Sequence, residues 1–147
     1  MMQFRRKKKE KKFDRLGFPV KSRKKSERSA LEASLDRIFS LYIRHRDKCC
    51  HRCRREWDIK KLYNHHIFTR AHRGTRWDEE ACIAVCFSCH EFAHSFTEEF
   101  RDWVIGWMGQ KEYDRLKVKA MGRVKFTESD LTMILFDLKK KLKEVSK

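Results

Sequence analysis

Apolar residues recur every three or four positions in two long stretches, one in the first third of the chain and one at its C-terminal end. The first stretch predicts a helix over residues 29–45, and the second predicts a helix that follows a capping box at residues 127–130. The repeating positions are Leu31, Leu35, Ile38, Phe39 and Tyr42, then Leu131, Leu135, Leu138, Leu142 and Val145. We expect both apolar stripes to pack into a core rather than to carry chemistry.

Between these helices the pattern changes to short apolar runs. Residues 62–68 and 81–85 have the length and composition of strands, and a basic loop over residues 69–77 lies between them. Residues 90–108 return to helical spacing, with Gly106 and Gly109 near the expected end, and residues 110–120 predict one more helix that ends at Gly122. The pattern therefore predicts an α+β protein in which a small strand pair is flanked by helices.

Composition narrows the functional classes. The chain has 147 residues and a formal net charge of +16. Because phosphate contacts release counterions, this charge favours nucleic acid as a partner over the alternative of a merely soluble basic protein. No run of about 18 apolar residues exists, so no membrane span is expected. The basic N-terminus lacks the apolar segment of a secretory signal, which predicts a cytoplasmic location.

The first 28 residues form a separate compositional segment. Their basic residues fall mainly in two runs, residues 5–12 and 21–25, on either side of the single proline, Pro19. Such blocks of like charge bury little apolar surface, so we expect residues 1–28 to be a disordered basic arm. An arm that seeks nucleic acid is the functional interpretation, and a plain solvated tail is the alternative. Residues 29–147 would then form a single domain.

Two C-x-x-C pairs, Cys50 with Cys53 and Cys86 with Cys89, are separated by 32 residues. A two-residue gap lets a tight turn direct two thiolates at one ion, and two such pairs have the spacing of a closed four-thiolate zinc site. A closed site has no open coordination position, so we assign this zinc to folding. Cys49 is a looser substitute for Cys50. The alternative is four unrelated buried cysteines, which would not explain why both pairs have the same two-residue gap.

Four histidines favour a second metal site. His90 and His94 are four residues apart on the predicted helix, so they share one face and present two imidazoles to one ion. His65 and His66 are neighbours on the predicted strand, where adjacent side chains point to opposite faces. One of them is expected to complete the metal site and the other to face the substrate. The alternative is a set of buried histidines in a protein that only binds DNA.

The order of these motifs resembles that of a known nuclease motif. Three runs are similar to the ββα-metal motif of HNH endonucleases: residues 65–67, residues 77–80, and Cys86-x2-Cys89-His90-x3-His94. Residues 35–145 further resemble the phage NinG (Rap) recombination endonucleases, in the run at residues 43–47, the C-x-x-C pair, the run at residues 75–79 and the closing helices. The resemblance implies DNA cleavage with one divalent metal.

The resemblance also implies roles for individual residues. His66 falls at the position of the general base, which takes a proton from the attacking water. His65, His90 and His94 fall at the ligand positions of the catalytic divalent metal. Arg76, in the basic loop, is the candidate that would hold the scissile phosphate.

The sequence departs from the HNH motif at two positions. Ala81 stands near the place of the Asn that usually braces the loop, so that brace is missing or supplied elsewhere. His65 stands where many HNH enzymes have Asp. An all-imidazole ligand set suits Zn²⁺, Ni²⁺ or Mn²⁺ better than Mg²⁺, which prefers oxygen, so the identity of the catalytic metal stays open.

The sequence thus predicts a small ββα-metal (HNH) core with a four-cysteine zinc clamp, flanking helices and a disordered basic arm. Residues 29–147 would be a nuclease domain that hydrolyses phosphodiester bonds in DNA, in phage recombination and on branched or joint molecules. The alternatives are a nicking or homing-type HNH nuclease and a catalytically inactive, zinc-stapled DNA-binding protein. Paired cuts, one in each DNA strand, would need two active sites, and a homodimer would supply them.

Overall fold

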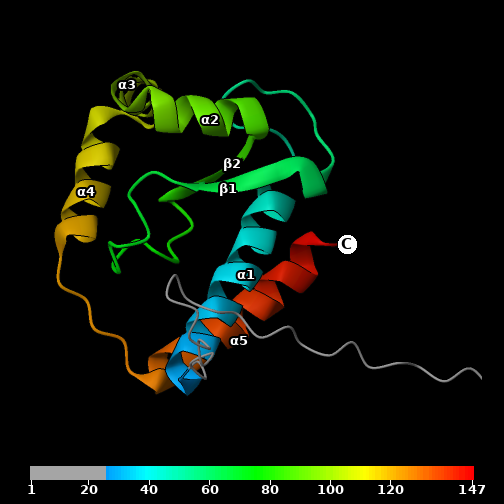
Figure 1. Cartoon of the computed structure of the whole chain (residues 1–147), viewed down its shortest axis with the longest axis vertical. Helices are drawn as coiled ribbons and strands as arrows, with labels where there is room; N and C mark the ends of the chain where they lie inside the picture. The colour runs from blue at the N-terminus through cyan, green and yellow to red at the C-terminus, as the bar shows by residue number, and fades with distance from the viewer. Residues whose placement is uncertain (1–25) are drawn as a thin grey trace, which may run out of the picture.

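The computed structural model describes residues 26–147, in which helices surround one pair of strands (Figure 1). The elements are α1 (Glu27–Asp47), a 3-10 turn (Ile59–Lys61), β1 (Leu62–His66), β2 (Cys82–Cys86), α2 (Phe87–Ser95), α3 (Thr97–Met108), α4 (Gln110–Met121) and α5 (Glu128–Val145). The predicted α+β composition is therefore confirmed. The basic arm predicted for residues 1–28 falls, up to residue 25, outside the described residues.

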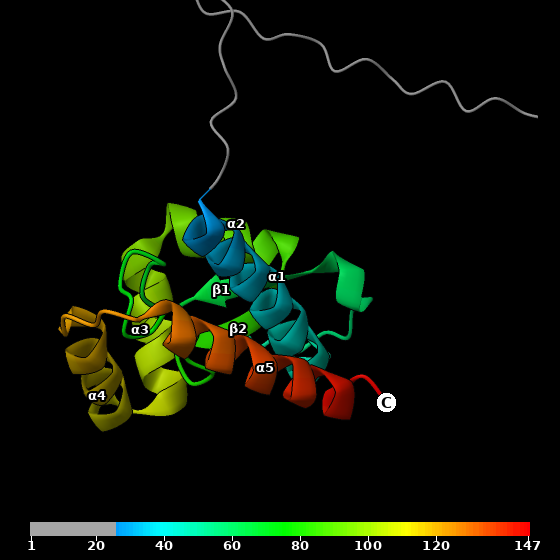
Figure 2. The ribbon, with the colours of Figure 1, turned by 90° about the horizontal axis from the view of Figure 1, so that it is seen from below.

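The first and last helices, α1 and α5, pack side by side although they are far apart in the sequence (Figure 2). The Ser26 side chain accepts a hydrogen bond from the backbone N–H of Ser29, so α1 begins two residues before the predicted start. The predicted capping box of α5 is confirmed, because Thr127 and Asp130 exchange side-chain and backbone hydrogen bonds. Leu35 of α1 is fully buried in the core to which α5 contributes Leu131 and Leu138.

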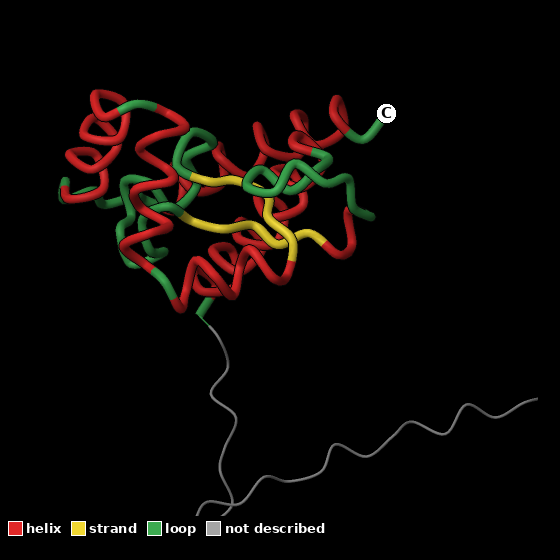
Figure 3. Tube along the Cα trace, turned by 90° about the horizontal axis from the view of Figure 1, so that it is seen from above, coloured by secondary structure: helices red, strands yellow, loops and turns green. Residues whose placement is uncertain are grey.

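The strand pair lies at the centre of the molecule, with α1 and α5 on one side and α2 on the other (Figures 1 and 3). β1 and β2 are antiparallel, and His65 stands opposite Ile83. All of β2 is buried, because helices cover both faces of the pair. Alternation along β1 puts Tyr63 and His65 on one face and Asn64 and His66 on the other. The two neighbouring histidines are therefore separated by the strand itself.

Side chains at the C-terminal end of α1 brace the strand pair through its backbone. The Arg46 guanidinium donates to the carbonyl of Glu79 at 2.7 Å and to that of Cys82 at 2.9 Å. The Asp47 carboxylate accepts the backbone N–H of Ala84 at 2.7 Å. These contacts hold the return into β2, close to Ala81. In this chain Arg46 and Asp47 brace the connection from another element.

The single helix predicted for residues 90–108 is wrong, because the chain forms two helices there. α2 begins earlier, at Phe87, and Phe96 leaves the helical conformation with φ −125° and ψ 67°. Glu98 and Glu99 then occupy the first turn of α3, where acidic residues suit the positive end of a helix. The bend turns α3 back toward the strands, and the Phe100 ring contacts the His65 ring with centroids 4.7 Å apart.

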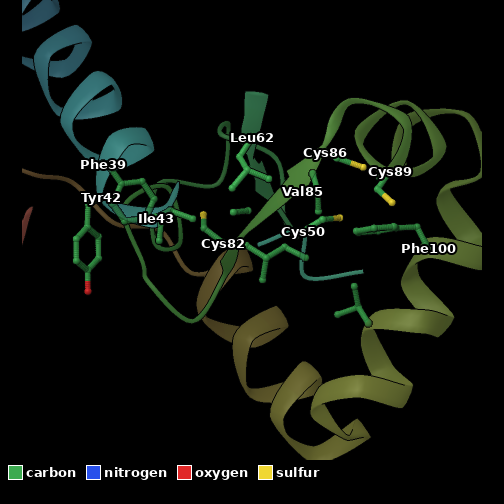
Figure 4. Packing of buried hydrophobic residues seen from close by; sticks show 14 of the residues in the cluster. Phe39, Tyr42, Ile43, Cys50, Leu62, Cys82, Val85, Cys86, Cys89 and Phe100 are labelled. Atoms are coloured by element: carbon green, nitrogen blue, oxygen red, sulfur yellow. The ribbon is translucent and has the colours of Figure 1, made fainter. Parts of the chain in front are cut away.

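The core has two parts that meet at the strand pair (Figure 4). Phe39 and Ile43 of α1 fill one part, and Phe100 belongs to the other, beside the cysteines. Val85 lies between them in β2. Among residues 26–147, none of the helices combines the length and the apolar character that crossing a membrane requires.

Candidate functional site

The four cysteines of the two C-x-x-C pairs come together in one cluster. The sulfur atoms of Cys50, Cys53, Cys86 and Cys89 all lie within 4.8 Å of one another. Cys50, Cys86 and Cys89 are buried, and Figure 4 shows their sulfur atoms gathered at the start of α2. With Zn–S bonds of about 2.3 Å, a tetrahedral zinc site has sulfur atoms about 3.8 Å apart. The 4.0 Å between the sulfur atoms of Cys53 and Cys86 is close to this edge.

Backbone hydrogen bonds shape the turn that carries the first cysteine pair. The Arg54 N–H donates to the carbonyl of Cys50 at 2.8 Å, and Arg54 adopts the left-handed conformation with φ 59°. The His51 N–H donates to the carbonyl of Ala84 at 2.8 Å, which fastens the turn to β2. The second pair needs no separate turn, because Cys86 ends β2 and Cys89 lies in the first turn of α2. The clamp thus joins the segment after α1 to the strand–helix junction.

The chemistry of the cysteine cluster fits a structural metal such as zinc. Burial raises the pKa of the Cys89 thiol to about 12, although a hydrogen bond from Arg52 acts in the opposite direction. Buried thiolates this close together need a cation to compensate their charge, and zinc deprotonates the thiols that ligate it. The Arg52 guanidinium also lies over the Phe92 ring, 3.8 Å from its centroid, and so closes this side of the cluster.

Three histidines form a second cluster, on the face of β1 that α2 covers. One ring nitrogen each from His65, His90 and His94 lies within 4.8 Å of the others. His90 and His94 share a face of α2, with ring centroids 4.6 Å apart, and His65 reaches them from β1. His65 is 8% exposed and His94 is exposed, so the cluster runs from the core to the surface.

The electrostatics of this cluster favour neutral imidazoles at His65 and His90. Burial, followed by the proximity of His90 and His94, lowers the pKa of His65 to about 3. Burial also lowers the pKa of His90. Neutral rings keep a lone pair on one nitrogen, which is the form of histidine that ligates metals. The donor set thus fits a transition-metal ion better than an oxygen-seeking cation such as Mg²⁺.

His66 lies apart from these three rings, as the alternation along the strand predicted. Its Nε2 lies 3.1 Å from the backbone carbonyl oxygen of Arg76. Because a carbonyl can only accept, Nε2 carries the proton and the neutral ring keeps its lone pair on Nδ1. Burial lowers the pKa of His66, although the hydrogen bond to Arg76 acts in the opposite direction. His66 is therefore a neutral base with its orientation fixed.

One cavity of about 320 Å³ joins the two histidine environments at the end of the strand pair. All four histidines line it. The remaining lining residues are Asp36, Ser40, Asn64, Thr69 and Arg70. The Oδ1 atom of Asn64 is buried and has no hydrogen-bond partner within residues 26–147. The cavity therefore brings neutral imidazoles, an unpaired amide oxygen and an exposed cation, Arg70, to one place.

Arg76, predicted to hold the phosphate, has its guanidinium committed to carboxylates. Its Nη2 and Nε atoms donate to the two oxygens of Asp36 at 2.7 and 3.1 Å, and Nη1 lies 3.5 Å from Glu32. Trp77 Nε1 also donates to Asp36, at 2.9 Å. The paired hydrogen bonds fix the backbone at Arg76, whose carbonyl meets His66. Within the described residues, Arg70 is the arginine that lines the cavity.

Comparison with known proteins gives one match, and it covers nearly the whole chain. The family described as Bacteriophage Lambda NinG protein matches residues 2–147. The chain belongs to the NinG family. Membership connects it with a phage, recombination-related function. No curated protein and no solved structure matches the chain.

Sequence reasoning missed several lining residues of this NinG-family chain. Asp36 lies on α1, in a helix for which the hydrophobic pattern predicts only packing, and it meets Arg76 from 40 positions away. Ser40, Asn64 and Thr69 are common polar residues without a motif. Arg70 was visible only as one of several cations in the basic loop. Its exposure and its place in the cavity, which separate it from Arg76, are set only in the folded chain.

Proposed function

We propose that this chain is a metal-dependent endonuclease that hydrolyses phosphodiester bonds in DNA, on the ββα-metal (HNH) plan, in phage recombination. One observation carries the proposal. Three imidazoles converge on a common point, and the neutral, oriented ring of His66 lines the same cavity. Hydrolysis of a phosphodiester needs both a stabiliser of negative charge and a base for the attacking water, and this cavity has candidates for both.

His66 is the proposed general base. The carbonyl of Arg76 takes the Nε2 proton, so Nδ1 is free to accept a proton from water. The Asp36 side chain holds the guanidinium of Arg76 and thereby fixes the carbonyl against which His66 is oriented. Arg76 thus becomes a positioning residue, and the phosphate-binding role predicted for it passes to Arg70.

His65, His90 and His94 are the proposed ligands of the catalytic metal, with Zn²⁺, Mn²⁺, Ni²⁺ and Mg²⁺ as candidates. A divalent ion, when bound there, would stabilise negative charge on the phosphate and on the leaving oxygen. His65 and His90 are anchored on paired elements, β1 and α2, so their separation is set before any ion binds. Such preformed placement lowers the cost of reaching the reactive geometry.

Arg70 is the proposed contact to the scissile phosphate. It is exposed and lines the cavity beside the histidines. Within residues 26–147, no carboxylate forms a hydrogen bond with its guanidinium. The net charge of +16 would attract DNA to the whole surface, and Arg70 would set the position of one phosphate within it. The four cysteines, with their own ion, would hold the start of α2 in place.

The alternative of an inactive DNA-binding protein is less well supported by this geometry. Buried polar groups cost free energy unless they are paired, and fold stability alone does not require three imidazoles to face one another. A metal site explains their convergence, whereas DNA binding alone leaves it unexplained.

A cleavage assay tests the proposal. The purified full chain would be stripped of loosely held metal and supplied with Zn²⁺, Mn²⁺, Ni²⁺ or Mg²⁺, with linear, nicked and four-way-junction DNA as substrates. We expect cleavage with at least one metal and none without. Metal analysis should find two ions per chain in the wild type. The His90→Ala variant should keep the ion held by the cysteines and lose the ion held by the histidines. Tight DNA binding without cleavage under every condition would support the inactive binding protein instead.

A further inference from the structure

Two exposed aromatic rings lie beside the histidine cluster and have no part in the proposed hydrolysis. Tyr63 of β1 is 43% exposed, and Phe87, the first residue of α2, is 60% exposed. Their ring centroids are 6.1 Å apart, and the Tyr63 ring lies 5.3 Å from that of His90. We propose that Tyr63 and Phe87, here called the aromatic pair, form a platform on which one unpaired base of the DNA stacks next to the cut.

The positions of the pair follow from the same elements that build the metal site. Tyr63 is two residues before His65 on β1, so both side chains lie on the same face of the strand. Phe87 is three residues before His90 on α2, so these two side chains lie on neighbouring turns of one helix face. The aromatic pair is therefore continuous with the histidine cluster, and its backbone positions are set by the same two elements.

The exposure of the pair contrasts with the two rings that pack on the faces of the strand pair. Phe39 and Phe100 fill the core on the two sides of the strands and are buried. A single exposed aromatic residue is ordinary. Two in contact, at the edge of a site proposed to bind DNA, offer ring faces that water solvates poorly and that a nucleobase would cover.

Charge complementarity supports a nucleotide as the occupant. Lys60 and Lys61 are exposed on the 3-10 turn that leads directly into β1, and Arg70 lines the cavity near the other end of that strand. Cations along a backbone path with aromatic rings beside it are the combination by which proteins bind single-stranded nucleic acid.

An unpaired base fits the platform better than a paired one. Inside a duplex each base is covered on both faces by its neighbours, so a protein ring can stack on it only after the base has left the helix. A base at a gap, a flap or a branch has a free face without that cost. The aromatic pair would therefore favour DNA in which the nucleotide beside the scissile phosphate is unpaired. The location of this base next to the cut rests on the proposed function, whereas binding of the base does not.

A binding experiment without cleavage tests the platform. Duplexes of one sequence would carry a single 2-aminopurine, either paired or unpaired at a gap, and would be titrated with the full chain without added divalent metal. We expect quenching of the unpaired reporter only. Tyr63→Leu and Phe87→Leu should each weaken binding to the gapped DNA by roughly 5- to 150-fold, the range found for one lost base stack. Binding to the intact duplex should change little.

Matched variants separate stacking from general damage. Tyr63→Phe and Phe87→Tyr keep an aromatic ring and should bind like the wild type. Phe136→Leu removes a ring that is 71% exposed on α5, outside the cavity lining, and should have no effect. An abasic nucleotide in place of the reporter should erase the difference between wild type and Tyr63→Leu. The inference is overturned if both leucine variants bind every DNA as tightly as the wild type does. It is also overturned if they lose the same affinity for gapped and for intact DNA.

The two proposals can fail separately. If no metal supports cleavage but the leucine variants still lose affinity for unpaired bases, the platform stands and the endonuclease does not. If cleavage occurs while both leucine variants bind and cut gapped DNA like the wild type, the endonuclease stands and the platform is overturned.

Discussion

The cysteine cluster and the histidine cluster lie next to each other on α2, where Cys89 and His90 are consecutive residues, yet their surroundings differ. Three of the four cysteines are buried, and the fourth, Cys53, is exposed on the turn at residues 50–53. The histidines run from the buried His65 to the exposed His94 and border a cavity. The first cluster is mostly buried in the core, and the second borders a cavity that a ligand could enter.

The clusters also differ in what they connect. The cysteines join two segments separated by 32 residues, and the turn at residues 50–53 belongs to no helix or strand of its own. The histidines connect β1 to α2, two elements that already pack together through the core. Loss of the first cluster should therefore cost the fold, and loss of the second should cost only chemistry. The following predictions test this contrast, from the largest expected effect to the smallest.

Cys53→Ser should have the largest effect, because the free energy of a structural zinc site, on the order of 10 kcal/mol, is available to folding. We expect the variant to lose cooperative thermal unfolding, followed by circular dichroism, together with its tightly held zinc. Cys49→Ser is the matched control, since Cys49 lies outside the cluster and should keep both properties. A Cys53→Ser protein that stays folded with a full complement of zinc would contradict the clamp.

His66→Ala should slow cleavage severely and leave the fold and DNA binding intact. Removal of a general base typically costs 10²- to 10⁴-fold in rate, roughly the range expected for kcat here. The measurement is single-turnover cleavage beside a DNA-binding titration and a melting curve. His45→Ala, at a histidine outside both clusters, should cut normally. Cleavage by His66→Ala at the wild-type rate would remove this residue from the mechanism.

Arg70→Ala should weaken DNA binding by roughly tenfold and lower the slope of log affinity against log salt by about one, as expected for one lost phosphate contact. Affinity measured at several salt concentrations gives both values. Lys140→Ala on α5 is the control for a cation outside the cavity. An unchanged salt slope for Arg70→Ala would contradict a phosphate contact by Arg70. The other residues of the basic loop would then be the candidates for this contact.

Asp36→Asn should have the smallest effect, because it keeps the shape of the side chain and one accepting oxygen, while it removes the charge and one of the two oxygens that accept from Arg76. The hydrogen bonds from Arg76 and Trp77 lower the pKa of Asp36 against the opposing effect of burial, so the aspartate is ionised at neutral pH. We expect a loss of roughly 3- to 10-fold in kcat with an unchanged KM, because the carbonyl of Arg76 orients the base and not the substrate. A rise in KM alone would place Asp36 among the substrate contacts.

Local patterns in the sequence predicted much of this molecule. The periodic stripes gave α1 and α5, and the spacing of the cysteines and histidines picked out two groups whose side chains do converge. The bend at Phe96 was not predicted, because Phe92, Phe96 and Phe100 keep helical spacing across it. The pairing of Asp36 with Arg76 escaped because it depends on how α1 crosses the strand pair, which no local pattern records. The strand boundaries differed by one or two residues.

The side-by-side packing of α1 and α5 has a consequence for biosynthesis. The apolar stripe of α1 emerges early in translation, and α5, the helix that covers it, is made about 100 residues later. Contacts between such distant segments form late in folding. We expect the growing polypeptide to stay incompletely folded until α5 has been synthesised. A cell making this protein would then meet the finished cavity only after α5 has packed against α1.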